Sequence, residues 1–88
     1  MNIKVIELCG YGPTADYEAV DLDNPKLDMS YIPEGWEFTG GNDEARKFTM
    51  EIMELQVYNE GKLIIFGAPS GTCGKDMARK LLEEWPRI

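Results

Sequence analysis

The sequence predicts an α+β fold in which a small single-layer mixed sheet of three to four strands is packed by two helices. Three observations lead to this class. Short β-branched and aromatic runs end at clusters of glycine, proline and asparagine, as strands do. Two longer stretches repeat apolar residues at three- and four-residue steps, the spacing of helices. The 88 residues suit one domain, residues 1–88, with a single thin core. The expected order is strand, strand, strand, helix, strand, helix.

The first half of the chain supplies the first three predicted strands. Residues 3–8 form a compact β-branched run that stops at the turn-rich residues 9–13, and residues 17–22 mix apolar and acidic side chains. An irregular segment broken by Pro33 and Gly35 then leads into a short strand at residues 36–39. We therefore expect one well-defined strand, a half-exposed second strand and a short third strand.

A helix is predicted after Gly41. Asn42 has a side chain suited to a helix cap, and the acids that follow it complement the positive end of a helix dipole. Gly61 can end the helix in the left-handed conformation. If this helix crosses between neighbouring strands, its flanking strands are parallel. Its apolar residues form two adjoining stripes, Ala45, Phe48, Ile52 and Leu55, and Met50, Met53 and Val57.

The last third of the chain predicts a buried strand and a second helix. Residues 62–66 contain the longest apolar run, and residues 67–74 form a glycine-rich loop. Pro86 closes the final helix. One face of that helix is apolar and contains Met77, Ala78, Leu81, Leu82 and Trp85.

The composition indicates a folded, non-enzymatic protein of the cytoplasm. Apolar residues make up 43% and charged residues 28% of the chain, close to ordinary globular usage. The longest apolar run is too short for a membrane span of about 20 residues, and the N-terminus lacks the features of a secretory signal. The chain has no histidine, which excludes the nucleophile pairs that depend on histidine and removes the commonest metal ligand. We expect no enzymatic activity and no cofactor.

Negative charge is concentrated in residues 7–44. This segment has ten acidic side chains against one basic side chain, Lys26, whereas residues 62–88 have five bases against three acids. Such a field repels phosphate backbones and accelerates encounters with cationic proteins, so we expect no direct binding to nucleic acid. The ten acids are Glu7, Asp16, Glu18, Asp21, Asp23, Asp28, Glu34, Glu37, Asp43 and Glu44.

Aromatic residues interleave with these acids and suggest a partner-binding surface. Aromatic side chains are favoured as anchors in protein interfaces, and carboxylates around them suit a basic site on a larger protein. We therefore expect a protein-interaction module, an inhibitor or adaptor, with nucleic-acid mimicry as one version. The alternative is that the acids only provide solubility and the aromatics form the core. The candidate partner-binding residues are Asp16, Tyr17, Glu18, Asp21, Asp23, Asp28, Tyr31, Glu34, Trp36 and Glu37.

The same acids raise the question of a metal site. Asp21, Asp23 and Asp28 offer oxygen ligands, but their spacing departs from the calcium-loop pattern. The glycine of the turn and the closing glutamate are both missing from that spacing. We therefore expect no metal.

Residues 64–82 resemble the strand, phosphate-binding loop and helix of P-loop nucleotide kinases. In that family, backbone N–H groups of the loop cradle phosphates, the lysine reaches the outer phosphates, and a hydroxyl holds magnesium. Here Pro69 stands where the motif needs its first glycine, and Asp76 stands at the position of the magnesium hydroxyl. These departures argue against a kinase and leave a small anion or phosphate site as the alternative function. Its candidate residues are Gly71, Thr72, Gly74 and Lys75.

The two cysteines define a thiol-dependent form of this alternative. Cys9 and Cys73 each stand beside a glycine after a predicted strand, so parallel neighbouring strands would bring them to one sheet edge. A helix N-terminus and Lys75 would lower the pKa of the Cys73 thiol. The other interpretation is two small buried hydrophobic residues, and we expect both thiols to be free. A structural subunit that associates through Trp85 and Ile88 is a third hypothesis.

Overall fold

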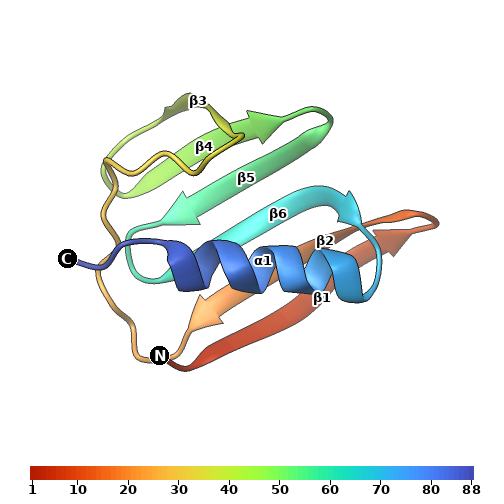
Figure 1. Cartoon of the computed structure of the whole chain (residues 1–88), viewed down its shortest axis with the longest axis horizontal. Coiled ribbons are helices and arrows are strands. Elements are labelled where there is room, and N and C mark those ends of the chain that lie inside the picture. The colour runs from red at the N-terminus through yellow and green to blue at the C-terminus, as the bar shows by residue number, and fades with distance from the viewer.

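Residues 1–88, with the exception of the Tyr11 side chain, are described by a computed structural model, and they form six strands and one helix (Figure 1). The strands form one sheet in the order β1-β2-β6-β5-β4-β3. The last strand of the chain therefore lies between the β1–β2 hairpin and the β3–β4–β5 meander. The elements are β1 (Ile3–Tyr11), β2 (Thr14–Asp21), β3 (Glu37–Gly41), β4 (Ala45–Met50), β5 (Met53–Tyr58), β6 (Lys62–Pro69) and α1 (Thr72–Glu84).

The predicted fold class is wrong. The described residues form six strands and one helix, where the sequence predicts three to four strands and two helices. Every pair of neighbouring strands in these residues is antiparallel, so the predicted mixed sheet and its parallel crossover are also wrong. The error lies after Gly41, where the chain forms the β4–β5 hairpin in place of the predicted first helix.

Asn42 makes the hydrogen bonds expected of a cap, but it makes them in a turn. Its Oδ1 accepts from the backbone N–H of Glu44 at 2.8 Å and from that of Ala45 at 3.1 Å. The same side-chain contact starts helices and shapes Asx turns, and here it forms part of the turn between β3 and β4. The capping signal therefore predicts the local hydrogen bonds correctly and the element wrongly.

The apolar residues of the predicted helix alternate across the hairpin. Phe48 in β4 pairs with Leu55 in β5, and Val57 follows on the same buried face. The stripe that predicts a helix also includes Ile52, which is 85% exposed at the turn. Glu51 forms this turn with a φ of 56°, a conformation that favours glycine. Because the two turn residues are neither glycine, proline nor asparagine, the sequence gives no hairpin signal.

The other predicted elements are confirmed in position. β1, β2, β3 and β6 fall on the four predicted strands, and β6 continues past the predicted end at Phe66 to Pro69. α1 starts at Thr72, inside the predicted loop, and ends before Pro86. Within the described chain, this helix is too short and too polar to cross a membrane.

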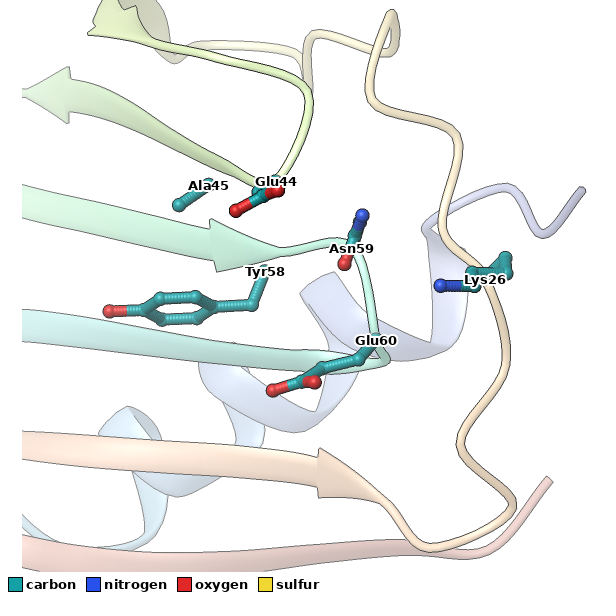
Figure 2. Close-up of a pocket in the computed structure, with 6 residues that line it drawn as sticks. All are labelled: Lys26, Glu44, Ala45, Tyr58, Asn59 and Glu60. Carbon is teal, nitrogen blue, oxygen red and sulfur yellow. The ribbon is translucent and has the colours of Figure 1, made fainter.

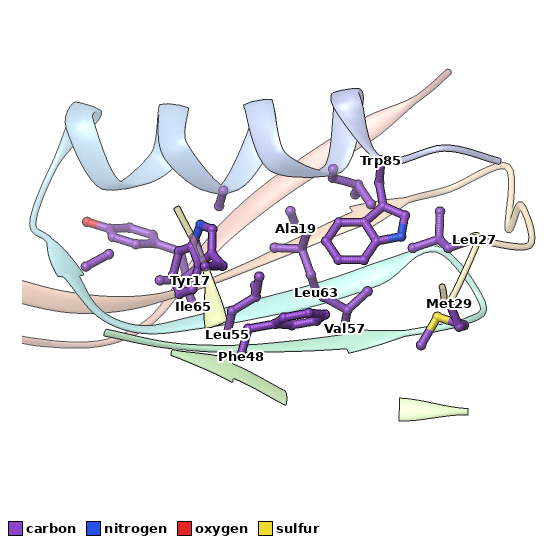
Figure 3. Close-up of a cluster of buried hydrophobic side chains, with 14 of the residues drawn as sticks. Tyr17, Ala19, Leu27, Met29, Phe48, Leu55, Val57, Leu63, Ile65 and Trp85 are labelled. Carbon is purple, nitrogen blue, oxygen red and sulfur yellow. The ribbon is translucent and has the colours of Figure 1, made fainter. Parts of the chain in front are cut away.

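The core lies between the sheet and a layer made by α1 and the connection from β2 to β3 (Figure 3). Alternate residues of β2 point into it, and Tyr17 is fully buried. α1 contributes Ala78 and Leu82. Trp85, just beyond the helix, packs edge-to-face on Phe48 with 5.8 Å between ring centroids. α1 lies over β1, β2 and β6 and packs its buried face against them. This packing fixes where the last turn of α1 lies relative to the sheet.

The C-terminal residues are tied to the start of the β2–β3 connection. Arg87 forms an antiparallel bridge with Leu27, and the Ile88 N–H donates to the Lys26 carbonyl at 2.9 Å. The Arg87 guanidinium also donates to the buried carboxylate of Asp21 at 3.0 Å. These contacts hold the β2–β3 connection beside the end of α1, where Figure 1 shows the two segments side by side.

Candidate functional site

The structure distributes the predicted partner-binding acids over different surfaces. Asp16 and Glu18 alternate with the buried residues of β2 and therefore lie on the sheet face opposite α1. The Asp16 carboxylate accepts from the Gly67 N–H at 2.9 Å. Asp23 is exposed and lies 3.4 Å from the N-terminal amino group, and Glu37 is exposed on the edge strand β3. The acids named in the sequence analysis thus do not form one surface.

Two of these acids are engaged in structural contacts. Burial raises the pKa of Asp21, but hydrogen bonds from Arg87 and from the backbone N–H groups of Asp23 and Asn2 outweigh it and lower the pKa below 3.8. The hydroxyl and N–H of Ser30 donate to Asp28 at 2.6 and 2.9 Å, and these bonds lower its pKa. Both carboxylates are therefore charged and already hydrogen-bonded.

The three aromatic residues among the candidate partner-binding residues point mainly inward. Tyr17 has no exposed surface, and its hydroxyl accepts from the Gly71 N–H at 2.6 Å and donates to Glu7 at 3.3 Å. Trp36 is 7% exposed. Tyr31 is half-buried and packs edge-to-face on Trp85 with 4.9 Å between ring centroids. Of the three rings, Tyr31 keeps a substantial surface for a partner.

A pocket at the C-terminal end of α1 brings Tyr31 together with two acids. Its volume is about 380 Å³. The β2–β3 connection supplies one side of it, and the last turn of α1 supplies the other. Tyr31 and Leu81 in it are half-buried and Pro33 is buried, whereas both glutamates are exposed. We call it the acidic pocket, and its residues are Tyr31, Pro33, Glu34, Leu81 and Glu84.

Three features of the acidic pocket favour a cation. The carboxylates of Glu34 and Glu84 both line it. The last turn of α1 reads Leu-Leu-Glu-Glu, so two acids and no base stand at the negative end of the helix dipole. The ring of Tyr31 adds a surface that attracts cations through its quadrupole. Arg87 also lies at this helix end, where it donates to the carbonyls of Leu82 and Trp85. The carboxylate that it pairs with is that of Asp21, which does not line the pocket.

Sequence reasoning identified two of the five residues of this pocket. Tyr31 and Glu34 are among the predicted partner-binding residues, whereas Leu81 and Glu84 lie about 50 positions further along the chain and were not. The contact depends on how the β2–β3 connection folds back to α1, which no local pattern predicts. A usable signal was present in Glu83 and Glu84, because acids at the C-terminus of a predicted helix oppose its dipole.

The predicted anion loop is occupied by contacts within the protein. A Cβ atom at Gly74 would lie 2.1 Å from the Pro69 carbonyl oxygen and 2.4 Å from Cε2 of Tyr17, so this glycine lets α1 approach the sheet. The Gly71 N–H donates to Tyr17, and the Lys75 N–H donates to the Gly71 carbonyl at 3.2 Å. Thr72 and Lys75 have exposed side chains. The glycines therefore serve packing and helix initiation.

The predicted meeting of the two cysteines does not occur. β2 lies between β1 and β6, so the strands that precede Cys9 and Cys73 are not neighbours. Cys9 pairs with Asp16 on the sheet face opposite α1, whereas Cys73 is exposed on α1 itself. The sheet separates the two thiols, and both are free.

Two further cavities lie at the end of the sheet that carries the β5–β6 turn. One of about 430 Å³ is drawn in Figure 2, where Glu44, Tyr58, Asn59 and Glu60 stand across from Lys26. Its charges are of both signs and therefore select neither a cation nor an anion. The second cavity shares Lys26 and Asn59 with it and has mainly apolar walls. Among the residues that the structure describes, no cluster of acids or cysteines could hold a metal ion.

Comparison with protein-family models, with curated proteins and with solved structures finds no match for this chain.

Proposed function

We propose that this protein is a non-catalytic interaction module that receives an arginine or lysine side chain of a larger protein in the acidic pocket. The observation that carries the proposal is the placement of Glu34, Glu84 and the Tyr31 ring around one cavity at the C-terminus of α1. A guanidinium or ammonium group can pair with the carboxylates, lie against the ring and interact with the helix dipole. The role is that of an inhibitor or adaptor that occupies a basic site of its partner.

The surroundings of the acidic pocket support an interface of this kind. Ile32, which follows Tyr31 in the sequence, is 53% exposed and offers an apolar contact on the same connection. Interfaces combine such apolar contacts with a small number of anchoring residues that supply most of the binding energy. The net charge of −7 would accelerate encounters with a basic partner. The proposal does not extend to nucleic-acid mimicry, because Asp16, Asp21 and the other predicted acids lie on different faces.

The electrostatics of the free protein also support a binding role. Glu83 and Glu84 oppose the dipole of α1, and the cation that contacts this helix end, Arg87, is shared with Asp21, so the two acids still cost stability. Residues that lower stability without a structural benefit are expected where function requires them. We also propose a reducing compartment, the cytoplasm, which is supported by two free thiols on opposite sides of the sheet.

The proposal can be tested with a pair of short peptides that differ in one charge. A blocked Gly-Arg-Gly peptide should shift the backbone amide signals of Tyr31, Glu34 and Glu84 in ¹H–¹⁵N spectra. The same peptide with citrulline, which keeps the shape of arginine without its charge, should not. Glu34→Gln combined with Glu84→Gln should weaken arginine binding at least about tenfold, equivalent to about 1.4 kcal/mol.

The matched control is Glu51→Gln combined with Glu60→Gln, which removes two exposed acids at other turns. This variant should bind the arginine peptide as the wild type does, apart from a small effect of net charge. Equal responses to arginine and citrulline would contradict the proposal. So would equal losses in the two double variants, because binding would then depend on total charge alone.

A further inference from the structure

The position of Arg46 in the fold is unusual for a charged residue. In β4 it pairs with the buried Val57 of β5 and lies two residues before the buried Phe48, so it stands on the sheet face that is covered by the core. Its side chain is only 21% exposed. Burying a guanidinium costs free energy unless charges and hydrogen bonds compensate it. Arg46 therefore needs compensating contacts at this position.

The contacts of Arg46 within the described residues are weak. Its Nε is buried and has no hydrogen-bond partner among them. Its Nη2 lies 3.6 Å from Asp43, whose side chain is 96% exposed, so that ion pair is long and well solvated. The guanidinium carbon lies 5.0 Å from the centre of the Phe38 ring. Arg46 also lowers the pKa of Asp28, whose carboxylate is hydrogen-bonded to Ser30.

Arg46 lines a cavity of about 370 Å³, which we call the arginine pocket. Its walls are mainly apolar and include Leu27, Met29 and Ile88, whereas Lys26 adds a second positive charge and Asp43 a single negative one. Pockets of this size hold small organic ligands, typically between apolar walls with a few polar groups that fix orientation. The arginine pocket combines such walls with a guanidinium that lacks a full set of partners.

We infer that the arginine pocket binds a small organic carboxylate, whose carboxylate pairs with Arg46 and whose apolar body lies on Leu27 and Met29. The planar guanidinium matches a carboxylate through two parallel N–H···O bonds, which its two Nη groups can donate. A single negative charge with an apolar body suits these walls better than a phosphate, which would bring more charge toward Asp43 and Asp28. This inference is independent of the acidic pocket, with which the arginine pocket shares no lining residue.

Hexanoate is a suitable probe, and hexanamide is its uncharged match. In ¹H–¹⁵N spectra, hexanoate should shift the Arg46 Nε–Hε signal, because its carboxylate pairs with the adjoining Nη groups of the same guanidinium. It should also shift the amide signals of Leu27, Met29 and Asn59, whereas hexanamide at the same concentration should leave the Nε–Hε signal in place. Sodium chloride keeps the ionic strength equal in both titrations.

Arg46→Met should abolish the hexanoate response, and Lys47→Met is the matched control. Lys47 is exposed and adjoins Arg46 on the opposite face of β4, so its variant loses the same charge without touching the pocket. If Arg46→Met does not fold, the wild-type Nε–Hε signal alone decides. An unmoved signal at about 20 mM hexanoate, where a ligand with a millimolar Kd would occupy most sites, overturns the inference. An equal shift with hexanamide does the same.

Discussion

At the scale of single residues, Asp21 is a buried carboxylate that keeps its charge because donors surround it. Its side chain accepts from the Asp23 N–H at 3.0 Å and from the Asn2 N–H at 3.3 Å, in addition to the Arg87 guanidinium. A charge buried with incomplete partners is far more costly than one with a full set. Asp21 therefore makes the stability of the sheet depend on Arg87, 66 residues further along the chain.

Arg87→Met is expected to destabilise the protein by about 3 kcal/mol, because it leaves the carboxylate of Asp21 buried without its cation. Urea denaturation followed by tryptophan fluorescence would measure the loss. Arg79→Met is the control, since Arg79 is an exposed arginine that donates to the Ile3 carbonyl at 3.1 Å. It should cost less than about 1 kcal/mol. A similar cost for both variants would show that Asp21 does not depend on its ion pair.

The same carboxylate predicts a dependence of stability on pH. The pKa of Asp21 is lower in the folded chain than its ordinary value of 3.8, so the unfolded chain binds more protons near that pH. The contribution of Asp21 is therefore present above about pH 4 and is lost as the pH falls through the folded pKa. Asp21→Asn should show a shallower loss of unfolding free energy on acidification than the wild type. Asp28, whose pKa is also lowered, should leave part of the dependence in place.

At the scale of elements, the turn of the β4–β5 hairpin is formed by residues that are poorly suited to a turn. Glu51 adopts a φ of 56°, and Ile52 is almost fully exposed at the tip. Glu51→Gly should stabilise the protein by about 0.5–1 kcal/mol, because glycine adopts positive φ without steric cost. Thermal unfolding would measure the gain. Ile52→Gly is the control and should not stabilise, since Ile52 does not have a positive φ. An increase in Tm for both variants would refute the assignment of strain to Glu51.

The hairpin also shows why local patterns predicted only part of the fold. Strand β1 and helix α1 carry signals that favour one element, a β-branched run and a single apolar face closed by Pro86. The segment after Asn42 carries signals that two elements share. The acidic pocket divides in the same way, because Tyr31 and Glu34 stand out locally, whereas Glu84 joins them only through the packing of α1.

At the scale of the whole molecule, the effect of an acidic side chain on stability depends on where it lies. Glu84→Lys should raise the free energy of unfolding by about 0.5 kcal/mol at low salt, because it replaces an unfavourable charge at the C-terminus of α1. Glu60→Lys changes the net charge equally at an exposed turn and should give a smaller gain. The difference between the variants should shrink at about 1 M salt, where the screening length is about 3 Å. Equal gains would assign the effect to net charge and not to the helix end.

The position of β6 in the sheet sets an order in which this protein can fold. β6 is synthesised after the other five strands of this sheet, yet it joins the β1–β2 hairpin to the β3–β4–β5 meander through antiparallel ladders on both sides. A nascent chain that lacks β6 and α1 therefore contains two unjoined sheets, each with an uncovered apolar face. Pairings between distant segments are slow to form, and exposed strand edges invite association with other chains. Folding of this sheet on the ribosome therefore waits until β6 and α1 have emerged, and until then the two unjoined sheets are the species most in need of a chaperone.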